Sequence, residues 1–349
     1  MQRHPALPAG TAAWVAALLA VLLLGGAATA RADASPHRLS GRSMGTTWSV
    51  TLASAPADRD ALQARIEDEL QRLTMQMSTW EPDSDLSRFN RSSGEWQTLP
   101  YDLHRVLTVA LQLARDTQGA YDPSVGPLVN LWGFGPDGAA RTRPPTHTAI
   151  RAAQARVGWQ RIELALRSRR ARQPGGMFVD VSSLGPGHAV DCIAARLREA
   201  GHADFLVELG GEMFAAGRKA NGEAWHVAVE RPDAALTDND DFDLVVTLQD
   251  VAIASSGDYR VGFEHAGRRY SHTIDPRRGE PVRHELAAVS VIAASTLQAD
   301  ALAAALLVLG PDAGWRYAQR HAIAAAFTLR NRGHYTRRVT PAFEAARVP

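Results

Sequence analysis

The chain has 349 residues, of which 45% are hydrophobic and 21% charged, as is typical of a globular protein with a sizeable core. The formal net charge is +1 and no long basic run is present, which excludes the electrostatic footprint of a nucleic-acid-binding protein. The length allows one large domain or two small ones. The only cysteine, Cys192, excludes an internal disulfide, and its helical, apolar context predicts a small core side chain.

Residues 1–30 have the pattern of a secretory signal peptide. Arg3 and His4 precede an apolar run over 14–28, which ends in Ala28-Thr29-Ala30. The alternative is a retained membrane anchor, but a span needs about 20 apolar residues, and this run is shorter and contains Gly25-Gly26. We therefore expect cleavage near Ala30 and a periplasmic protein without a stable membrane span.

The first half of the mature chain mixes one strand with two helices. Residues 46–53 alternate and are β-branched, which predicts a strand. Apolar residues at spacings of three and four then predict helices over 62–77 and 102–117. Residues 123–138 are rich in Gly and Pro and predict loops, followed by an exposed segment over 136–148.

The second half is richer in strands. We expect a helix over 189–200 that ends at Gly201, a helix over 299–309 that ends at Gly310, and a shorter helix around Trp315. The expected strands are 159–165, 178–184, 205–209, 225–230, 244–248, 252–255 and 287–293, with a basic turn at 167–172 and a final hairpin over 322–339. Strands and helices do not alternate strictly, so the prediction is a single α+β domain over about 40–343.

Several common catalytic motifs are missing. No Gly-x-Gly-x-x-Gly follows a strand and no glycine-rich loop ends in Gly-Lys-Ser/Thr, which argues against a Rossmann or P-loop nucleotide site. The absence of Gly-x-Ser-x-Gly argues against an esterase. No His-x-x-x-His pair indicates a zinc hydrolase.

What remains is a series of eight spaced polar clusters. In chain order they are GRSMGT (41–46), STWEPDSDLSRFN (78–90), GAYDPSVGPLVNLWGF (119–134), DVSSLGPGHAVD (180–191), ELGGE (208–212), SSGDY (255–259), SHTIDPRRG (271–279) and QADALAAAL (298–306). Each alone is weak evidence. In this order, over most of the mature chain, they resemble the ApbE family of FAD:protein FMN transferases.

The resemblance implies an activity and a set of site residues. Members of the family bind FAD and Mg²⁺, transfer the FMN half to a threonine hydroxyl of a partner flavoprotein, and release AMP. His272 matches the active-site histidine and Asp300 the metal carboxylate; Ser183, Ala303 and Ala304 fall at the other metal positions, Ser183 through its backbone carbonyl. The flavin-pocket positions are Met44, Trp80 (in place of the usual tyrosine), Gly119, Ala120, Tyr121, Asp180, Pro186 and Ile274.

Purely structural roles are the alternative for the two central residues, Asp300 and His272. Asp300 at the start of a predicted helix is also what the helix dipole favours. His272 could serve only to stabilise the turn at Asp275-Pro276. The general chemistry supports the functional interpretation, because oxygen ligands suit a divalent ion at a pyrophosphate, and a histidine can act as a base near neutral pH.

Two departures from the family pattern reduce the positive charge and the ligands at the pyrophosphate. Pro186 stands where the family has lysine, and Ala304 where it has the threonine that completes the metal shell; His188 also replaces an aromatic residue. His188, Arg277 or Arg278 could restore part of the charge. Three interpretations stay open: a working transferase, a non-catalytic flavin carrier or assembly factor for a periplasmic redox complex, and hydrolysis of FAD to FMN and AMP. The expected partner is a subunit of a membrane electron-transfer complex.

Overall fold

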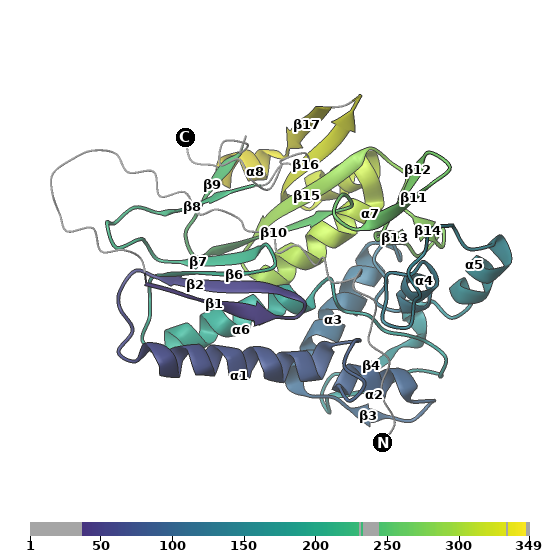
Figure 1. Cartoon of the computed structure of the whole chain (residues 1–349), viewed down its shortest axis with the longest axis horizontal. Coiled ribbons are helices and arrows are strands. Elements are labelled where there is room, and N and C mark those ends of the chain that lie inside the picture. Colours follow the sequence, from purple (N-terminus) through teal and green to yellow (C-terminus); the bar gives the residue numbers. More distant parts are fainter. Residues whose placement is uncertain (1–36, 230–231, 233–243, 333, 347–349) are drawn as a thin grey trace, which may run out of the picture.

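The computed structural model describes residues 37–229, 232, 244–332 and 334–346 (Figure 1). Its central element is an eight-stranded sheet in which all neighbouring strands are antiparallel, in the order β1-β2-β6-β7-β10-β15-β16-β17. These strands are β1 (His37–Ser43), β2 (Thr46–Leu52), β6 (Phe205–Leu209), β7 (Glu212–Ala216), β10 (Val251–Gly257), β15 (Leu286–Ala293), β16 (Ala324–Asn331) and β17 (His334–Val339).

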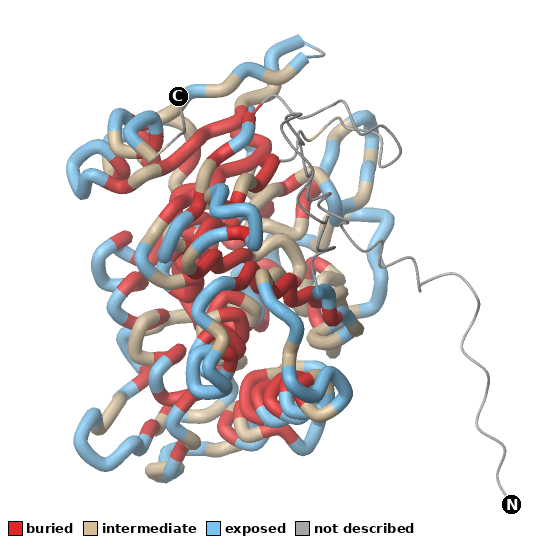
Figure 2. The backbone as a smooth tube through the Cα atoms, turned by 90° about the vertical axis from the view of Figure 1, so that its left-hand side faces the viewer, coloured by how far each residue is buried: buried red, intermediate tan, exposed pale blue. Residues whose placement is uncertain are grey.

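Both faces of this sheet are covered, which explains why inner strands such as β6, β7 and β15 are nearly continuous apolar runs. Helices α1 (Arg59–Met77), α6 (Gly185–Glu199) and α7 (Thr296–Arg320) pack on one face. The hairpin β8 (Trp225–Ala228) and β9 (Val245–Leu248), with α8 (Pro341–Ala346), covers the other. Because successive side chains point to opposite faces, Val207 belongs to the first core and Leu206 to the second. Figure 2 shows the buried segments running through the centre of the molecule.

One end of the molecule, made mostly of helices, lies beside the sheet face that α1, α6 and α7 cover. It contains α2 (Asp85–Arg91), α3 (Tyr101–Asp116), the 3-10 turn η1 (Trp159–Arg161) and a small sheet of β3 (Gln97–Thr98), β5 (Arg170–Arg172) and β4 (Glu163–Ala165). Helix α3 contacts both α1 and α7. This end therefore shares its core with the large sheet and does not form a second domain.

A third, aromatic core packs α4 (Gly126–Leu131) and α5 (His147–Gln154) against two short hairpins. These are β11 (Gly262–His265) with β12 (Arg268–Ser271), and β13 (Ile274–Asp275) with β14 (Glu280–Pro281). The Trp132 and Tyr270 rings stack with centroids 5.6 Å apart, and Tyr270 stacks on Phe263 at 5.1 Å. These stacked rings hold the β11–β12 hairpin in place, and His272 directly follows β12.

The α+β prediction of one domain is confirmed, as are the predicted long helices and the final hairpin. Gly310 has φ 81° and precedes Pro311, which divides α7 into the two predicted parts. The strand predicted over 178–184 is wrong. Its backbone groups bond to loops and a side chain instead: Val179 pairs with the Asn90 amide, and the Asp180 N–H donates to the Pro123 carbonyl at 2.7 Å. The strand predicted over 159–165 is confirmed only in its second half, after η1.

The predicted signal peptide, residues 1–30, lies outside the described residues. Among the helices that the structure describes, none has the length and apolar character required to cross a bilayer.

Candidate active site

Asp300 is held at the junction of α6 and α7. The start of α7 is bound to α6 by Asp191, whose carboxylate accepts from the N–H groups of Thr296 at 2.7 Å and Leu297 at 3.0 Å. Asp300 is only 4% exposed, and its Oδ2 accepts from the Gly187 N–H at 3.1 Å. The carboxylate therefore lies between the first turns of two helices, where N–H groups favour negative charge.

Gly187 is required for this approach. A Cβ atom on Gly187 would lie 2.7 Å from the Thr296 carbonyl oxygen and 2.8 Å from the Asp300 Cβ. Pro186 precedes it in the first turn of α6, where a helix leaves its N–H groups unpaired and proline is tolerated. Proline in place of the expected lysine therefore does not disrupt α6. It does remove a positive charge from the residue next to Gly187, which contacts Asp300.

The electrostatics around Asp300 indicate a site for a cation. Burial raises the pKa of the Asp300 carboxyl well above its usual range, and the carboxylates of Glu212 and Asp191 raise it further. Burial likewise raises the pKa of Glu212 to about 8, and Glu208 adds to the shift. No lysine or arginine among the described residues forms an ion pair with Asp300. A divalent ion with oxygen ligands would relieve this repulsion, so the residues present fit the Mg²⁺ that the family pattern implies.

Tyr121 and the 178–184 segment form the neighbouring wall. The Ser183 hydroxyl donates to the Tyr121 hydroxyl oxygen at 3.4 Å, and Asp180 accepts from the Ser182 N–H at 2.9 Å. Burial raises the pKa of Tyr121, and the carboxylates of Asp180 and Asp300 raise it further. Tyr121, Asp180, Ser183 and Asp300 are thus brought together from three separate stretches of the chain.

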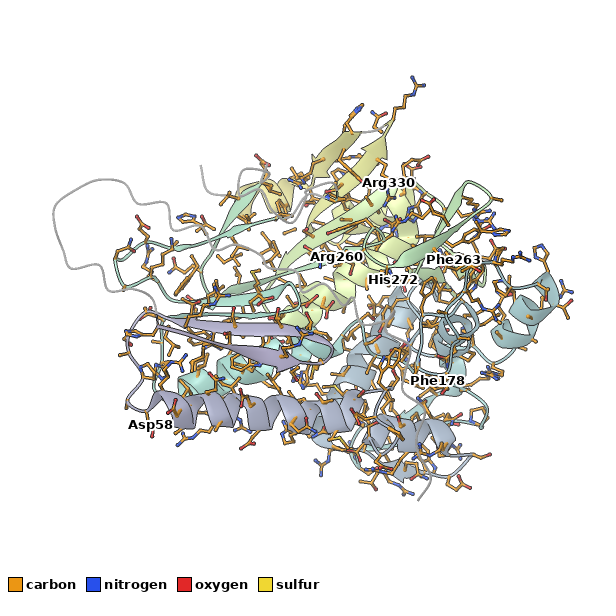
Figure 3. All side chains as sticks on the ribbon, in the orientation of Figure 1. Asp58, Phe178, Arg260, Phe263, His272 and Arg330 are labelled. Atoms are coloured by element: carbon orange, nitrogen blue, oxygen red, sulfur yellow. The ribbon has the colours of Figure 1, made fainter. Side chains whose placement is uncertain are left out.

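His272 belongs to the second part of the candidate site and lies against the segment that follows β10. Its N–H donates to the Val261 carbonyl at 3.2 Å, and its Nδ1 lies 3.3 Å from the same oxygen. The Phe134 ring meets the imidazole edge-on. Burial lowers the pKa of His272, which favours the neutral ring. Figure 3 labels His272 where the chain leaves β12.

The remaining predicted residues are placed at varying depth. Gly119, with φ 78°, allows the turn after α3, and Ala120 is buried. Met44 and Gly45 both have positive φ and form the two-residue β1–β2 turn. Ile274 is buried in the aromatic core, so its backbone is the part able to meet a ligand. Trp80 is 57% exposed, with its ring at the surface.

Ala303 and Ala304 lie on α7, one turn beyond Asp300. Ala303 is fully buried and Ala304 is half-buried against the main core. A methyl group at 304 offers no ligand atom, and Ala303 can offer only its carbonyl. Whether these alanines and Ser183 contribute to a metal shell stays a prediction.

The structure corrects the suggestion that His188 or Arg277 restores the missing charge. His188 Nε2 lies 2.9 Å from Asp102 Oδ1, and Arg277 forms a two-pronged ion pair with Asp275 at 2.9 Å. Each is already paired with a carboxylate of its own.

Two residues of the site were missed by sequence reasoning. Glu212 ends the ELGGE cluster, whose Gly210 and Gly211 both have positive φ, and its carboxylate lies close enough to Asp300 to raise the pKa of that residue. Arg260 follows the SSGDY cluster and is the cation whose charge lowers the pKa of Glu212. The polar residues that flank both turns were the available indication, but sequence alone did not pair them.

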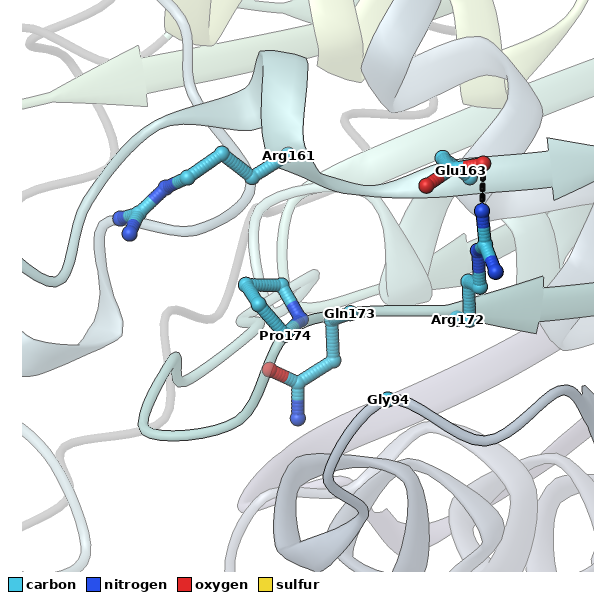
Figure 4. Close-up of a pocket in the computed structure, with 6 residues that line it drawn as sticks. All are labelled: Gly94, Arg161, Glu163, Arg172, Gln173 and Pro174. Atoms are coloured by element: carbon cyan, nitrogen blue, oxygen red, sulfur yellow. Dashed lines mark hydrogen bonds and ion pairs between the residues drawn. The ribbon is translucent and has the colours of Figure 1, made fainter.

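A separate surface pocket of about 370 Å³ lies at the small sheet (Figure 4). It is lined by Gly94, Arg161, Glu163, Arg172, Gln173 and Pro174, and Arg172 bonds Glu163 across it at 2.8 Å. None of the predicted site residues lines it.

The α+β fold and the candidate site define a flavin transferase. The chain belongs to the ApbE family, whose family model matches residues 44–327. It is 34% identical to the FAD:protein FMN transferase of Haemophilus influenzae, over 95% of this chain and 97% of that protein. The corresponding protein of Vibrio cholerae is 37% identical, with 89% and 91% covered. The structure of the Pseudomonas stutzeri flavinyl transferase ApbE, in its apo form, superposes with a TM-score of 0.81 at 38% identity, covering 89% of this chain and 96% of that one.

Proposed function

We propose that this protein is an FAD:protein FMN transferase that uses Mg²⁺ and modifies a threonine hydroxyl of a target flavoprotein. Relatives with that name match it over almost their whole length. The observation within the molecule that carries the proposal is the buried Asp300 carboxylate, held by the Gly187 N–H at the α6–α7 junction and repelled by the half-buried Glu212. A group of neighbouring acids with raised pKa values is typical of a functional site.

The reaction divides its demands between the two parts of the site. The acceptor oxygen attacks the phosphorus on the FMN side of the pyrophosphate, the bond from that phosphorus to the bridging oxygen breaks, and AMP leaves with that oxygen. His272, held neutral by burial, accepts the proton of the hydroxyl. Asp300 and Glu212 would hold the ion, which supplies neutralisation of the pyrophosphate charge.

The second candidate is a non-catalytic flavin-binding protein, favoured by Pro186 and Ala304. Loss of a charge-assisted contact and a ligand at the pyrophosphate would cost a few kcal/mol and hence orders of magnitude in rate. Such a protein would still bind FAD and could act as a carrier or assembly factor.

The test is incubation of purified protein with FAD, Mg²⁺ and a protein acceptor bearing a threonine, followed by intact-mass measurement. Active transfer adds the mass of the FMN group to the acceptor and releases AMP. FAD binding without a mass shift, over a series of divalent metals, supports the carrier. Formation of free FMN and AMP, with the acceptor unmodified, identifies hydrolysis.

The proposed setting is the periplasm, where the acceptor would be a subunit of a membrane electron-transfer complex. Support comes from the signal-peptide pattern of residues 1–30. Cell fractionation with an antibody to the mature chain tests this placement, and recovery in the cytoplasmic fraction contradicts it.

A further inference from the structure

Three potential metal ligands converge on the side of α6 that faces α3. They are Asp102 of α3 and, one turn apart on α6, His188 and Cys192. Asp102 Oδ1 lies 2.9 Å from His188 Nε2, Cys192 Sγ lies 3.5 Å from the same nitrogen, and the sulfur lies 3.9 Å from the Asp102 oxygen. Asp102 is 7% and His188 3% exposed, while Cys192 is partly buried.

This triangle has the size of one face of a metal-centred tetrahedron. With bond lengths of about 2.0–2.2 Å to nitrogen and oxygen and about 2.3 Å to sulfur, tetrahedral zinc separates such ligand atoms by roughly 3.3–3.6 Å. We propose that Asp102, His188 and Cys192 form a Zn²⁺ site, distinct from the flavin site. Shifts of the ligand atoms by a few tenths of an ångström suffice to admit the ion.

The arrangement does not suit a nucleophilic cysteine. In a catalytic triad the two ring nitrogens of histidine serve different partners, one the nucleophile and one the acid. Here the thiol and the carboxylate both approach Nε2. Burial, together with the charges of Asp102 and Glu69, raises the pKa of Cys192 to about 12, the opposite of activation. Convergence on one point is what a metal requires.

The donor set selects the class of metal. One carboxylate, one imidazole and one thiolate suit a borderline-soft ion such as Zn²⁺, whereas Mg²⁺ requires oxygen ligands. Binding replaces the thiol proton, which is released to solvent as the sulfur–metal bond forms. Solvent or an added ligand supplies the fourth position.

Neighbouring charges support the ligands. Arg72 donates to Asp102 Oδ2 at 2.7 Å, which leaves Oδ1 turned toward His188. Arg72 is itself held by Glu69 at 2.8 Å, and Arg196 lies 3.5 Å from the same glutamate. Hydrogen-bonded carboxylate ligands of this kind fix the geometry of metal sites.

An ion here would fasten α6 to α3 in a chain that has no second cysteine for a disulfide. His188 directly follows Gly187, whose N–H donates to Asp300. A metal at His188 would therefore also steady the first turn of α6 against the candidate active site.

The experiment is metal binding by the purified full-length chain after chelator treatment. Zn²⁺ is added alone and the bound metal counted after gel filtration, and Co²⁺ is added in parallel to detect the thiolate-to-cobalt charge-transfer absorption. We expect one equivalent of Zn²⁺, a cobalt–thiolate band, and protection of the thiol from a thiol reagent. Cys192→Ala should abolish the band and weaken Zn²⁺ binding by on the order of 100-fold.

Asp300→Asn is the matched control, because it removes the flavin-site carboxylate and leaves the three ligands intact. It should keep the cobalt–thiolate band in full. FAD binding by Cys192→Ala shows that this variant is folded, and separates failure of the zinc site from failure of the flavin site. The proposal is overturned if wild type binds no Zn²⁺, if binding survives in Cys192→Ala, or if Zn²⁺ leaves the thiol unprotected.

Discussion

The two parts of the candidate active site balance their carboxylates in different ways. On the histidine side, buried acids are paired with arginines: Asp258 accepts from Arg330 at 3.0 Å, and Asp275 from Arg277 at 2.9 Å. On the acidic side, the Glu212 carboxylate raises the pKa of Asp300, and the Glu208 carboxylate raises that of Glu212. Paired acids need no further cation, whereas unpaired buried acids are costly unless a ligand neutralises them. The first part therefore neutralises its acids with arginines of the chain, whereas the acids of the second part suit the Mg²⁺ that we propose.

The largest effect is expected from Asp300→Asn, which tests whether the acidic side needs its charge. The amide has nearly the same shape but carries no charge, so the ion loses its principal ligand, and transfer should fall by on the order of 10³-fold. The metal-free protein should be no less stable than wild type in a thermal melt, because a neutral amide replaces a carboxyl whose ionisation is disfavoured by burial and by Glu212. The initial rate of acceptor flavinylation measures the first effect. Loss of less than tenfold would contradict the assigned role.

His272→Gln tests the histidine side, with an expected loss of about 10²-fold in transfer. Because burial lowers the pKa of His272 below its ordinary 6.5, the neutral base is already present at neutral pH. The wild-type rate should therefore fall only below pH 6.5 and stay flat above it, and the glutamine variant should lack this fall.

The lowered pKa of His272 also sets how this residue affects folding stability as the pH changes. Between the lowered pKa and 6.5 the folded chain binds fewer protons at His272 than the unfolded chain. This residue therefore opposes folding at acidic pH, and the penalty disappears as the pH rises through 6.5. Thermal melts of wild type and His272→Gln over this range should converge at pH 7. A wild-type rate profile that falls above pH 7 would contradict a simple base.

Pro186→Lys combined with Ala304→Thr adds a positive charge and a hydroxyl ligand to the acidic side. Pro186 occupies a first-turn position of α6, so lysine can replace it without loss of a helix hydrogen bond. Transfer should rise by about 10- to 100-fold. The two single variants, assayed by acceptor mass, show which loss matters more. An unchanged rate would mean that the chain compensates elsewhere, with Arg260 the first residue to examine.

The sequence predicted both His272 and Asp300 as site residues, but it indicated the surroundings of His272 more fully than those of Asp300, for a physical reason. His272 lies in one contiguous cluster, and its support comes from the adjoining hairpin. The surroundings of Asp300 come from α6, α7 and the β6–β7 turn, far apart in the chain, so periodicity could place each element but not their contact. The helix pattern predicted α6, yet nothing in it indicated that Gly187 faces Asp300 and His188 faces Asp102.

The error over 178–184 has the same origin. Val179 and Val181 suggested a strand. In the structure the side-chain amide of Asn90 instead forms the hydrogen bonds with the Val179 N–H and carbonyl that a neighbouring strand would have formed. Apolar alternation predicts burial on one side and cannot tell which group completes the hydrogen bonds.

The smallest expected effect concerns the contact that joins the two helices at the acidic side. Gly187→Ala places a methyl group 2.7 Å from the Thr296 carbonyl oxygen, part of a backbone that cannot rotate away, and 2.9 Å from Asp300 Oδ2. We expect a loss of about 1–3 kcal/mol in the free energy of unfolding and weaker Mg²⁺ binding. Gly185→Ala is the matched control in the same helical turn, where a Cβ meets nothing within 4 Å. Equal denaturation midpoints for the two variants would show that α6 and α7 can separate at no cost, and that Asp300 does not depend on their contact for its position.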